Sequence, residues 1–331
     1  MTMHTQADMQ QWRGRVDALE GEAGKRWHQV VSPELAAPSG KGIALVGFAC
    51  DAGVARNHGR IGASKGPAAT RAALGNMPVH ACRSIVDAGD IAPRQQGDHD
   101  GLEEAQQELA ARIDDILSCG RLPVALGGGH EIAFGSFSGL ARHLAARPGV
   151  PRIGVINLDA HFDLRMAEQA SSGTPFRQIA EDCASRGWAF NYCCLGISRF
   201  GNTEALFECA RKLGVRWRLD EEMSLLHLGE TLHSVQDFLA GVDHVYFTTC
   251  LDVLPAATAP GVSAPAARGV SLEVIESIVD AVAGSGKLRV ADIAELNPAH
   301  DIDQRTARVA ARLVARIADA YCAARTEDAQ A

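Results

Sequence analysis

The sequence lacks the long apolar segments that membrane proteins and exported proteins carry. It has no run of about eighteen consecutive apolar residues, which is the length that a membrane-spanning helix needs. The N-terminal residues 1–27 are polar and charged, without the apolar core of a secretory signal. We therefore expect a cytoplasmic protein with no membrane partner.

Positive charge and paired cysteines are also scarce. Lys and Arg together number 32 against 40 Asp and Glu, and the basic residues are scattered, so we expect a small-molecule substrate and no nucleic acid. The nine cysteines are odd in number and show no CxxC spacing. This pattern is typical of reduced thiols in a cytoplasm.

What the sequence does contain is a regular alternation of short apolar runs and longer amphipathic stretches. The apolar runs predict buried strands at Lys41–Cys50, Arg83–Ala92, Leu122–Leu126, Arg152–Leu158, Tyr192–Ile197, Val245–Cys250 and Leu288–Ile293. The amphipathic stretches predict helices at Gly66–Leu74, Leu102–Leu117, Ile132–Leu144, Glu204–Lys212, Ser271–Val282 and Asp303–Cys322. Such alternation predicts an α/β fold of three layers, a doubly wound, mostly parallel sheet with helices on both faces. We expect residues 1–40 to form an N-terminal arm and residues 41–325 a single domain.

Three predicted strands end in polar residues, at the sheet edge where such folds bind ligands. The first runs into Gly127-Gly-Gly-His130-Glu131, where glycines allow a sharp turn that presents His130. Taken alone, this motif favours a plain strand-to-helix turn over a binding site.

The second strand end carries Asp159, His161 and Asp163, which alternation places on one side of the chain. One interpretation is a hydrogen-bonded cap, in which Asp163 starts a helix and His161 belongs to the core. We favour a divalent metal site instead, because three ionisable groups at the end of a buried strand are costly without a cation.

The third strand ends in Cys250-Leu-Asp252, which again places two potential ligands two residues apart. Asp252 alone fits a turn before Pro255, and Cys250 alone fits an inert buried thiol. Together with the other two strand ends, however, they complete one predicted metal cluster.

These three segments, in this order, resemble the GG(D/G)H, DAHxD and DxDxxD/P marks of the arginase, agmatinase and formimidoylglutamase family. Arg60–Pro67 followed by Arg71 is similar to the family's RxGxxxGPxxxR element, and Glu295–Pro298 is similar to its ExNP element. The resemblance runs from about Val46 to the C-terminal helix, and five ordered elements are far more specific than any one of them. It implies an arginase-like fold.

The resemblance also implies two Mn²⁺ ions per subunit. By position, their ligands would be His130, Asp159, His161, Asp163, Cys250 and Asp252. Position 250 is a metal-bridging aspartate in the family and is Cys250 here. A thiolate is softer than manganese prefers, so weaker affinity, loss of one ion and preference for a softer ion all stay open.

The segments Val54–Asn57, Ser171–Arg177 and Asp252–Pro265 resemble the branch of the family that acts in histidine degradation. This implies hydrolysis of N-formimidoyl-L-glutamate to L-glutamate and formamide, with a metal-bridging hydroxide attacking the formimidoyl carbon. Asp163 would protonate the leaving amine, and Glu295 would hydrogen-bond the formimidoyl nitrogens. The resemblance leaves open whether the chain forms a homo-oligomer.

The two carboxylates of such a substrate call for arginines with planar donor forks. We predict Arg56, Asn57 and Arg177 as substrate-binding residues because of their Gly- and Pro-rich surroundings. Arg165 and Arg199 are second choices, since surface salt bridges explain them equally well.

Two other functions stay open. The first is an agmatinase or another guanidino-acid hydrolase of the family. The second is a non-catalytic binding protein that has lost the bridging aspartate at Cys250. Arginase itself is disfavoured, because its substrate-loop histidine corresponds to Phe176.

Overall fold

The computed structural model describes residues 4–35, 42–94 and 99–327. Its strands are β1 (His4–Thr5), β2 (Val31–Ser32), β3 (Ile43–Phe48), β4 (Ile85–Ile91), β5 (Leu122–Gly127), β6 (Ile153–Leu158), β7 (Asn191–Ile197), β8 (Arg216–Leu219), β9 (His244–Cys250) and β10 (Leu288–Ala294). Its α-helices are α1 (Ala52–Arg56), α2 (Gly66–Gly75), α3 (Leu102–Ser118), α4 (Ile132–Ala145), α5 (Pro175–Arg186), α6 (Glu204–Lys212), α7 (Leu228–Ala240), α8 (Leu272–Ala283) and α9 (Arg305–Glu327).

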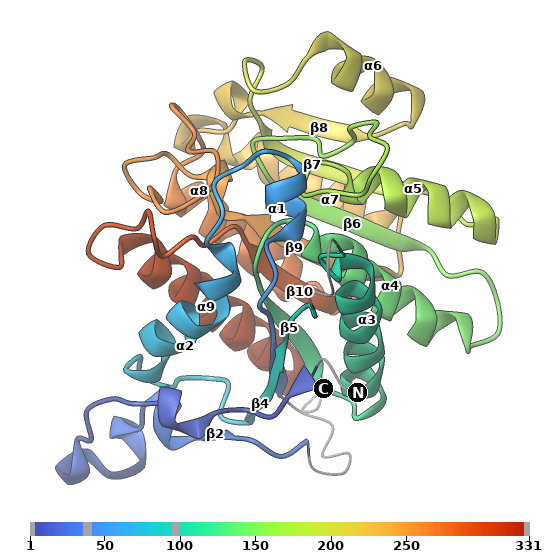
Figure 1. The fold of residues 1–331 in the computed structure, drawn as a ribbon. Coiled ribbons are helices and arrows are strands. Elements are labelled where there is room, and N and C mark those ends of the chain that lie inside the picture. The colour runs from blue at the N-terminus through green and yellow to red at the C-terminus, as the bar shows by residue number, and fades with distance from the viewer. Residues whose placement is uncertain (1–3, 36–41, 95–98, 328–331) are drawn as a thin grey trace.

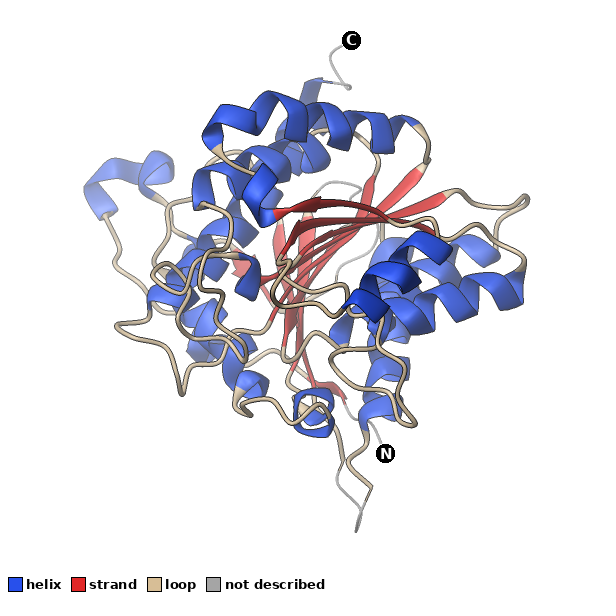
Figure 2. Ribbon diagram, turned by 90° about the horizontal axis from the view of Figure 1, so that it is seen from above, coloured by secondary structure: helices blue, strands red, loops and turns tan. Residues whose placement is uncertain are grey.

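The strands form one sheet in the order β1-β4-β3-β5-β10-β9-β6-β7-β8, and β2 also pairs with β4. Within the described residues, β1 pairs antiparallel with β4 and the other strand pairs are parallel. Figures 1 and 2 show helices on both sides of this sheet. The prediction of a three-layer, mostly parallel α/β fold is confirmed.

Each face of the sheet buries its own apolar layer. Strand β3 shows how, because alternate residues of a strand point to opposite faces. Ile43 and Leu45 join the layer covered by α2, α7, α8 and α9. Ala44 and Val46 join the layer covered by α3, α4, α5 and α6. No helix in the described ranges is long and apolar enough to cross a membrane.

The predicted strands and helices all form, with ends shifted by a few residues, but some elements were missed. Helices α1, α5 and α7 and strands β1, β2 and β8 had not been predicted. The segment Ser171–Arg177 runs into α5, which begins at Pro175, where a proline suits the first turn of a helix. No helix starts at Asp163, which has φ +48° in an irregular segment, so the interpretation of Asp163 as a helix cap is wrong.

The described part of the predicted N-terminal arm, residues 4–35, packs on the edge of the sheet. Strands β1 and β2 both pair with β4. The buried Trp12 donates a hydrogen bond from Nε1 to Asp87 Oδ2 at 2.8 Å. The predicted boundary between residues 40 and 41 lies outside the described residues.

A buried ion-pair network holds α2 against β4. Arg71 lies 2.9 Å from Asp87 and 2.6 Å from Asp90, and both Arg71 and Asp87 are almost completely buried. Breaking a buried pair leaves an uncompensated charge, so Arg71→Leu should lower the free energy of unfolding by about 3–5 kcal/mol in chemical denaturation. Arg152→Leu is the control, because the pair of Arg152 with Asp243 is exposed and should contribute little. Equal losses in the two variants would contradict this account.

Candidate metal centre

The predicted ligands come together because four neighbouring strands, β5, β10, β9 and β6, end at the same level. Ala294 of β10 lies beside Cys250 of β9, and Leu158 of β6 lies beside Thr249. The residues that directly follow these strands therefore converge at one edge of the sheet. Asp159 follows β6, and Glu295 follows β10.

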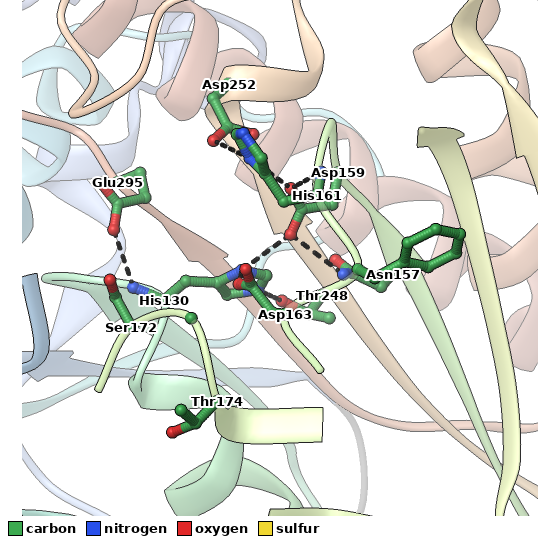
Figure 3. A network of polar contacts seen from close by, with 12 residues as sticks. His130, Asn157, Asp159, His161, Asp163, Ser172, Thr174, Thr248, Asp252 and Glu295 are labelled. Carbon is green, nitrogen blue, oxygen red and sulfur yellow. Dashed lines mark hydrogen bonds and ion pairs between the residues drawn. The ribbon is translucent and has the colours of Figure 1, made fainter. Parts of the chain in front are cut away.

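Two imidazole rings face carboxylates across this edge (Figure 3). The Nδ1 atom of His130 lies 2.9 Å from Asp159 Oδ2 and 3.0 Å from Asp163 Oδ2. The Nδ1 atom of His161 lies 3.1 Å from Asp252 Oδ2 and 3.5 Å from Asp159 Oδ1. Asp159 therefore lies between the two histidines.

The side chains form two overlapping groups of three with ligand atoms within 4.8 Å of one another. One group consists of His130, Asp159 and Cys250, and the other of Asp159, His161 and Asp252. Carboxylate oxygens and imidazole nitrogens suit Mn²⁺, whereas the thiol is a softer donor. The geometry thus fits two divalent cations that share Asp159.

The cluster contains several buried acidic groups, and this concentration of negative charge favours the binding of cations. Burial, and then the charge of Asp159, raise the pKa of Asp163 to about 6. Burial, and then nearby carboxylates, raise the pKa of Glu295 to about 8 and that of the Cys250 thiol well above its ordinary value. Negative groups thus crowd a buried space, and a bound cation would favour their ionised forms.

Neighbouring polar and aromatic residues orient the ligands. Thr248 Oγ1 lies 3.0 Å from His130 Nε2, and Asn157 Nδ2 donates to Asp159 Oδ2 at 3.1 Å. Phe176 packs its ring edge-to-face with His130, so it supports that ligand. The sequence analysis missed Thr248 and Asn157. Their signal was a polar residue two positions before a ligand on the same face of an apolar strand.

Glu295 has one carboxylate oxygen engaged and one without a partner. Oε1 accepts a hydrogen bond from the His130 backbone N–H at 3.0 Å. Oε2 is buried and has no hydrogen-bond partner among the described residues. Glu295 also has φ +74°, a backbone conformation that non-glycine residues rarely adopt and that clusters at functional sites. These observations point to a ligand-binding role for Oε2.

Most side chains of the cluster, though not Asp159, line a cavity of about 300 Å³. The cavity is lined by Asn57, His58, Gly59, Arg60, His130, His161, Asp163, Arg165, Ser172, Cys250, Asp252, Ser263, Ala264 and Glu295. Asn57 was predicted as a substrate residue, and Arg165 was a second choice. Arg60 belongs to a motif that the sequence analysis quoted without giving the residue a role in binding.

The other predicted substrate arginines do not line this cavity. Arg56 donates hydrogen bonds to Asp100 and Glu103, which neutralise its guanidinium group. Arg177 lies on α5 and pairs with Glu181 at 3.0 Å. Arg199, a second choice, pairs with Glu221.

Arg165 is placed differently from these arginines. It is exposed at the cavity, and its guanidinium group makes no hydrogen bond or ion pair with a described residue. A Cβ atom at Gly173 would lie 2.9 Å from Arg165 Cδ and 3.2 Å from Asn57 Nδ2. The absence of a side chain at Gly173 thus lets Arg165 and Asn57 lie together at the cavity.

The fold and this cluster agree with the comparison to known sequences. The profile of the arginase family matches residues 41–319, so the chain belongs to the arginase family. It is 65% identical over 319 residues to a formimidoylglutamase of Ralstonia nicotianae, covering 96% of this chain and 97% of that protein. It is 52% identical over 322 residues to a formimidoylglutamase of Aromatoleum aromaticum, covering 96% and 94%.

Solved structures give the same family. A crystal structure of Trypanosoma cruzi formiminoglutamase with Mn²⁺ superposes with a TM-score of 0.73 at 28% identity, covering 85% of this chain and 94% of that one. A formimidoylglutamase structure from Bacillus subtilis has a TM-score of 0.77 at 22% identity, covering 90% and 92%, and shows the common fold. The resemblance noted in the sequence is confirmed.

Proposed function

We propose that this chain hydrolyses N-formimidoyl-L-glutamate to L-glutamate and formamide. The observation that carries the proposal is the distribution of charge in the cavity. Among the residues that the structure describes, neither Glu295 Oε2 nor the guanidinium group of Arg165, which both lie at this cavity, has a hydrogen-bond or ion-pair partner. The substrate has a cationic amidine at one end and carboxylates at the other, which matches this layout. The names of the curated relatives support the same substrate.

Two Mn²⁺ ions per subunit would be held by the two groups of ligands that share Asp159, with Asp163 beside His130. When bound, such ions would lower the pKa of a water molecule and so supply a nucleophile at neutral pH. Phe176 packs edge-to-face against the His130 ring and so helps to hold this imidazole in place. The reduced thiols fit a cytoplasmic location.

The chain's own polar groups then handle the substrate. Glu295 Oε2 hydrogen-bonds the formimidoyl nitrogens and orients the carbon for attack. Asp163 takes up the proton released by the attacking water and passes it to the amine nitrogen of glutamate as the bond to the formimidoyl carbon breaks. Arg165 and Asn57 hold the substrate carboxylates at the wall of the cavity.

A substrate panel tests this function. Purified, Mn²⁺-loaded protein is given formimidoylglutamate, agmatine, arginine and 4-guanidinobutyrate, and formamide and urea are measured. We expect formamide and glutamate from the first compound and little urea from the others. Urea release from agmatine or 4-guanidinobutyrate in its place would favour a guanidino hydrolase. No product from any compound would favour the non-catalytic interpretation.

Arg165→Gln should raise KM for formimidoylglutamate at least about tenfold with a smaller change in kcat, because a charge-assisted contact to a carboxylate is lost far from the reacting bond. Initial rates over a range of substrate concentrations measure both constants. Arg177→Gln is the matched control and should leave KM within about twofold, since Arg177 lies outside the cavity. A larger increase in KM for Arg177→Gln than for Arg165→Gln would instead identify Arg177 as the substrate-binding arginine.

Cys250→Asp should bind Mn²⁺ about tenfold more tightly than the wild type, because a carboxylate is a harder donor than a thiol and ionises more readily. Titration of the metal-free protein with Mn²⁺ measures the affinity. Cys119→Asp, remote from the cluster and partly exposed, serves as the control. Weaker Mn²⁺ binding in Cys250→Asp would show that the thiol is the better ligand in this site.

A further inference from the structure

Glu131 is fully buried beside the metal cluster, and the proposed chemistry does not use its carboxyl group. It directly follows His130, and its Oε1 accepts a hydrogen bond from the Gly53 backbone N–H in α1 at 2.8 Å. Its own backbone carbonyl accepts a hydrogen bond from Gln106 Nε2 of α3 at 2.7 Å. Glu131 therefore links the loop that carries a metal ligand to a separate helix.

Two glycines make room for this carboxyl group. A Cβ atom at Gly53 would lie 2.6 Å from Glu131 Cδ, and a Cβ atom at Gly129 would lie 2.0 Å from Glu131 Oε2. Real Cβ atoms do not approach other atoms so closely, so an alanine at either position would displace the carboxyl group. We call the space between Gly53 and Gly129 the glutamate slot.

The slot is connected to the wall of the substrate cavity through hydrogen bonds. The Gly53 carbonyl accepts a hydrogen bond from the Ser172 N–H at 3.1 Å, and Asn57 Nδ2 donates to Ser172 Oγ at 3.1 Å. Ser172 and Asn57 line the cavity, and Gly173 next to Ser172 is the residue against which Arg165 lies. A chain of contacts thus runs from Glu131 through Gly53 to the residues proposed to hold the substrate carboxylates.

The backbone around the cluster has a separate support. Gly128 N–H donates to Phe48 O at 2.9 Å, and Gly129 N–H donates to Cys50 O at 3.0 Å. These bonds tie the loop before His130 to the end of β3 whatever residue stands at 131. Removal of the Glu131 carboxyl should therefore loosen α1 and the cavity wall more than it disturbs the metal ligands.

We propose that Glu131 is a positioning residue that sets substrate affinity by fixing α1 and the Ser172 segment against the metal-binding loop. This inference rests on the proposed function for the identity of the substrate. It assigns the Glu131 carboxyl no contact with substrate or metal. Its effect reaches the substrate through Gly53, Ser172 and Asn57.

A double-mutant cycle tests both the existence of the glutamate slot and the effect of Glu131 on substrate affinity. Glu131→Ala should raise KM about tenfold or more, with kcat and Mn²⁺ content near those of the wild type, and Glu131→Gln should largely restore KM because the amide oxygen still accepts from Gly53. Gly53→Ala should also raise KM in the wild-type background. It should add less in the Glu131→Ala background, because the carboxyl carbon that a Cβ atom at Gly53 would meet at 2.6 Å is gone and only the Cβ atom of residue 131, at 2.8 Å, remains. The midpoint of thermal unfolding should show the same lack of additivity.

Three results would each overturn the proposal. The first is that the Glu131→Ala and Gly53→Ala effects on KM and on thermal unfolding are additive, and the second is an unchanged KM in Glu131→Ala. The third is a loss of Mn²⁺ from Glu131→Ala that fully explains its loss of activity. The KM readout uses whichever compound of the substrate panel the wild type hydrolyses. If the wild type hydrolyses a compound other than formimidoylglutamate, the proposed function is contradicted, but the test of Glu131 can still be done with that compound. If the wild type hydrolyses none of them, the unfolding cycle alone decides whether the slot exists.

Discussion

Asp159→Asn should lower kcat/KM for formimidoylglutamate by more than about 1,000-fold. The reason is that a pair of bound metal ions would activate the attacking water, and Asp159 belongs to both groups of potential ligands for these ions. Asp159 is the residue common to both groups of potential ligands, and it is completely buried between His130 and His161. An amide has nearly the same shape as a carboxylate but lacks its charge. The substitution therefore weakens both ion sites without leaving a cavity.

The measurement is steady-state formamide release, with the Mn²⁺ content of each preparation determined in parallel. Asp220→Asn is the matched control, since Asp220 is a buried aspartate remote from the cluster, in the short helix after β8. It should retain activity within a few-fold. An Asp159→Asn protein with wild-type activity would contradict the assignment of Asp159 as the shared ligand.

Glu295→Gln should lower kcat/KM by about 100- to 1,000-fold, which is the usual cost of removing one preorganised electrostatic contact to the reacting group. Glu295 Oε2 is buried and has no hydrogen-bond partner in the described part of the chain, so the substrate amidine is the group that would satisfy it. A glutamine presents an uncharged amide there and loses the charge-assisted hydrogen bond.

This loss should differ in kind from that of Asp159→Asn, because Glu295 is no part of either group of potential ligands. Mn²⁺ content should stay at the wild-type level in Glu295→Gln. Glu276→Gln is the control, because Glu276 is a mostly buried glutamate that pairs with Arg312 and Arg316 on the far layer of helices. A full loss of bound Mn²⁺ in Glu295→Gln would show that Glu295 acts on the metal site and not on the substrate.

The sequence was sufficient to predict which side chains meet at the candidate metal site, because all of them lie at or shortly after the end of an apolar strand. His130, Asp159 and Asp252 come after three such runs, and the carboxyl ends of parallel strands meet at one edge. The order of the strands could not be derived in this way. Strands β9 and β10, late in the chain, lie between β5 and β6, and pairing of segments so far apart depends on the whole sheet.

The arginines that line the cavity were harder to predict for a related reason. An arginine whose donors are taken up by nearby carboxylates has fewer left for a ligand, and such partners are set by tertiary structure. Arg56 meets Asp100 and Glu103, which stand more than forty residues away in the sequence. Arg165 meets no such partner among the described residues. Glycine at position 173, which makes room for Arg165, gave no signal that could be separated from an ordinary turn.

The metal content of the purified chain tests the central claim most directly. After removal of metals, loading with Mn²⁺ and removal of the excess, elemental analysis should find two Mn²⁺ per chain in the wild type and at most one in Asp159→Asn. A wild-type protein that binds no Mn²⁺ under these conditions, or an Asp159→Asn protein that binds two, would contradict the account of strand ends that hold a pair of cations.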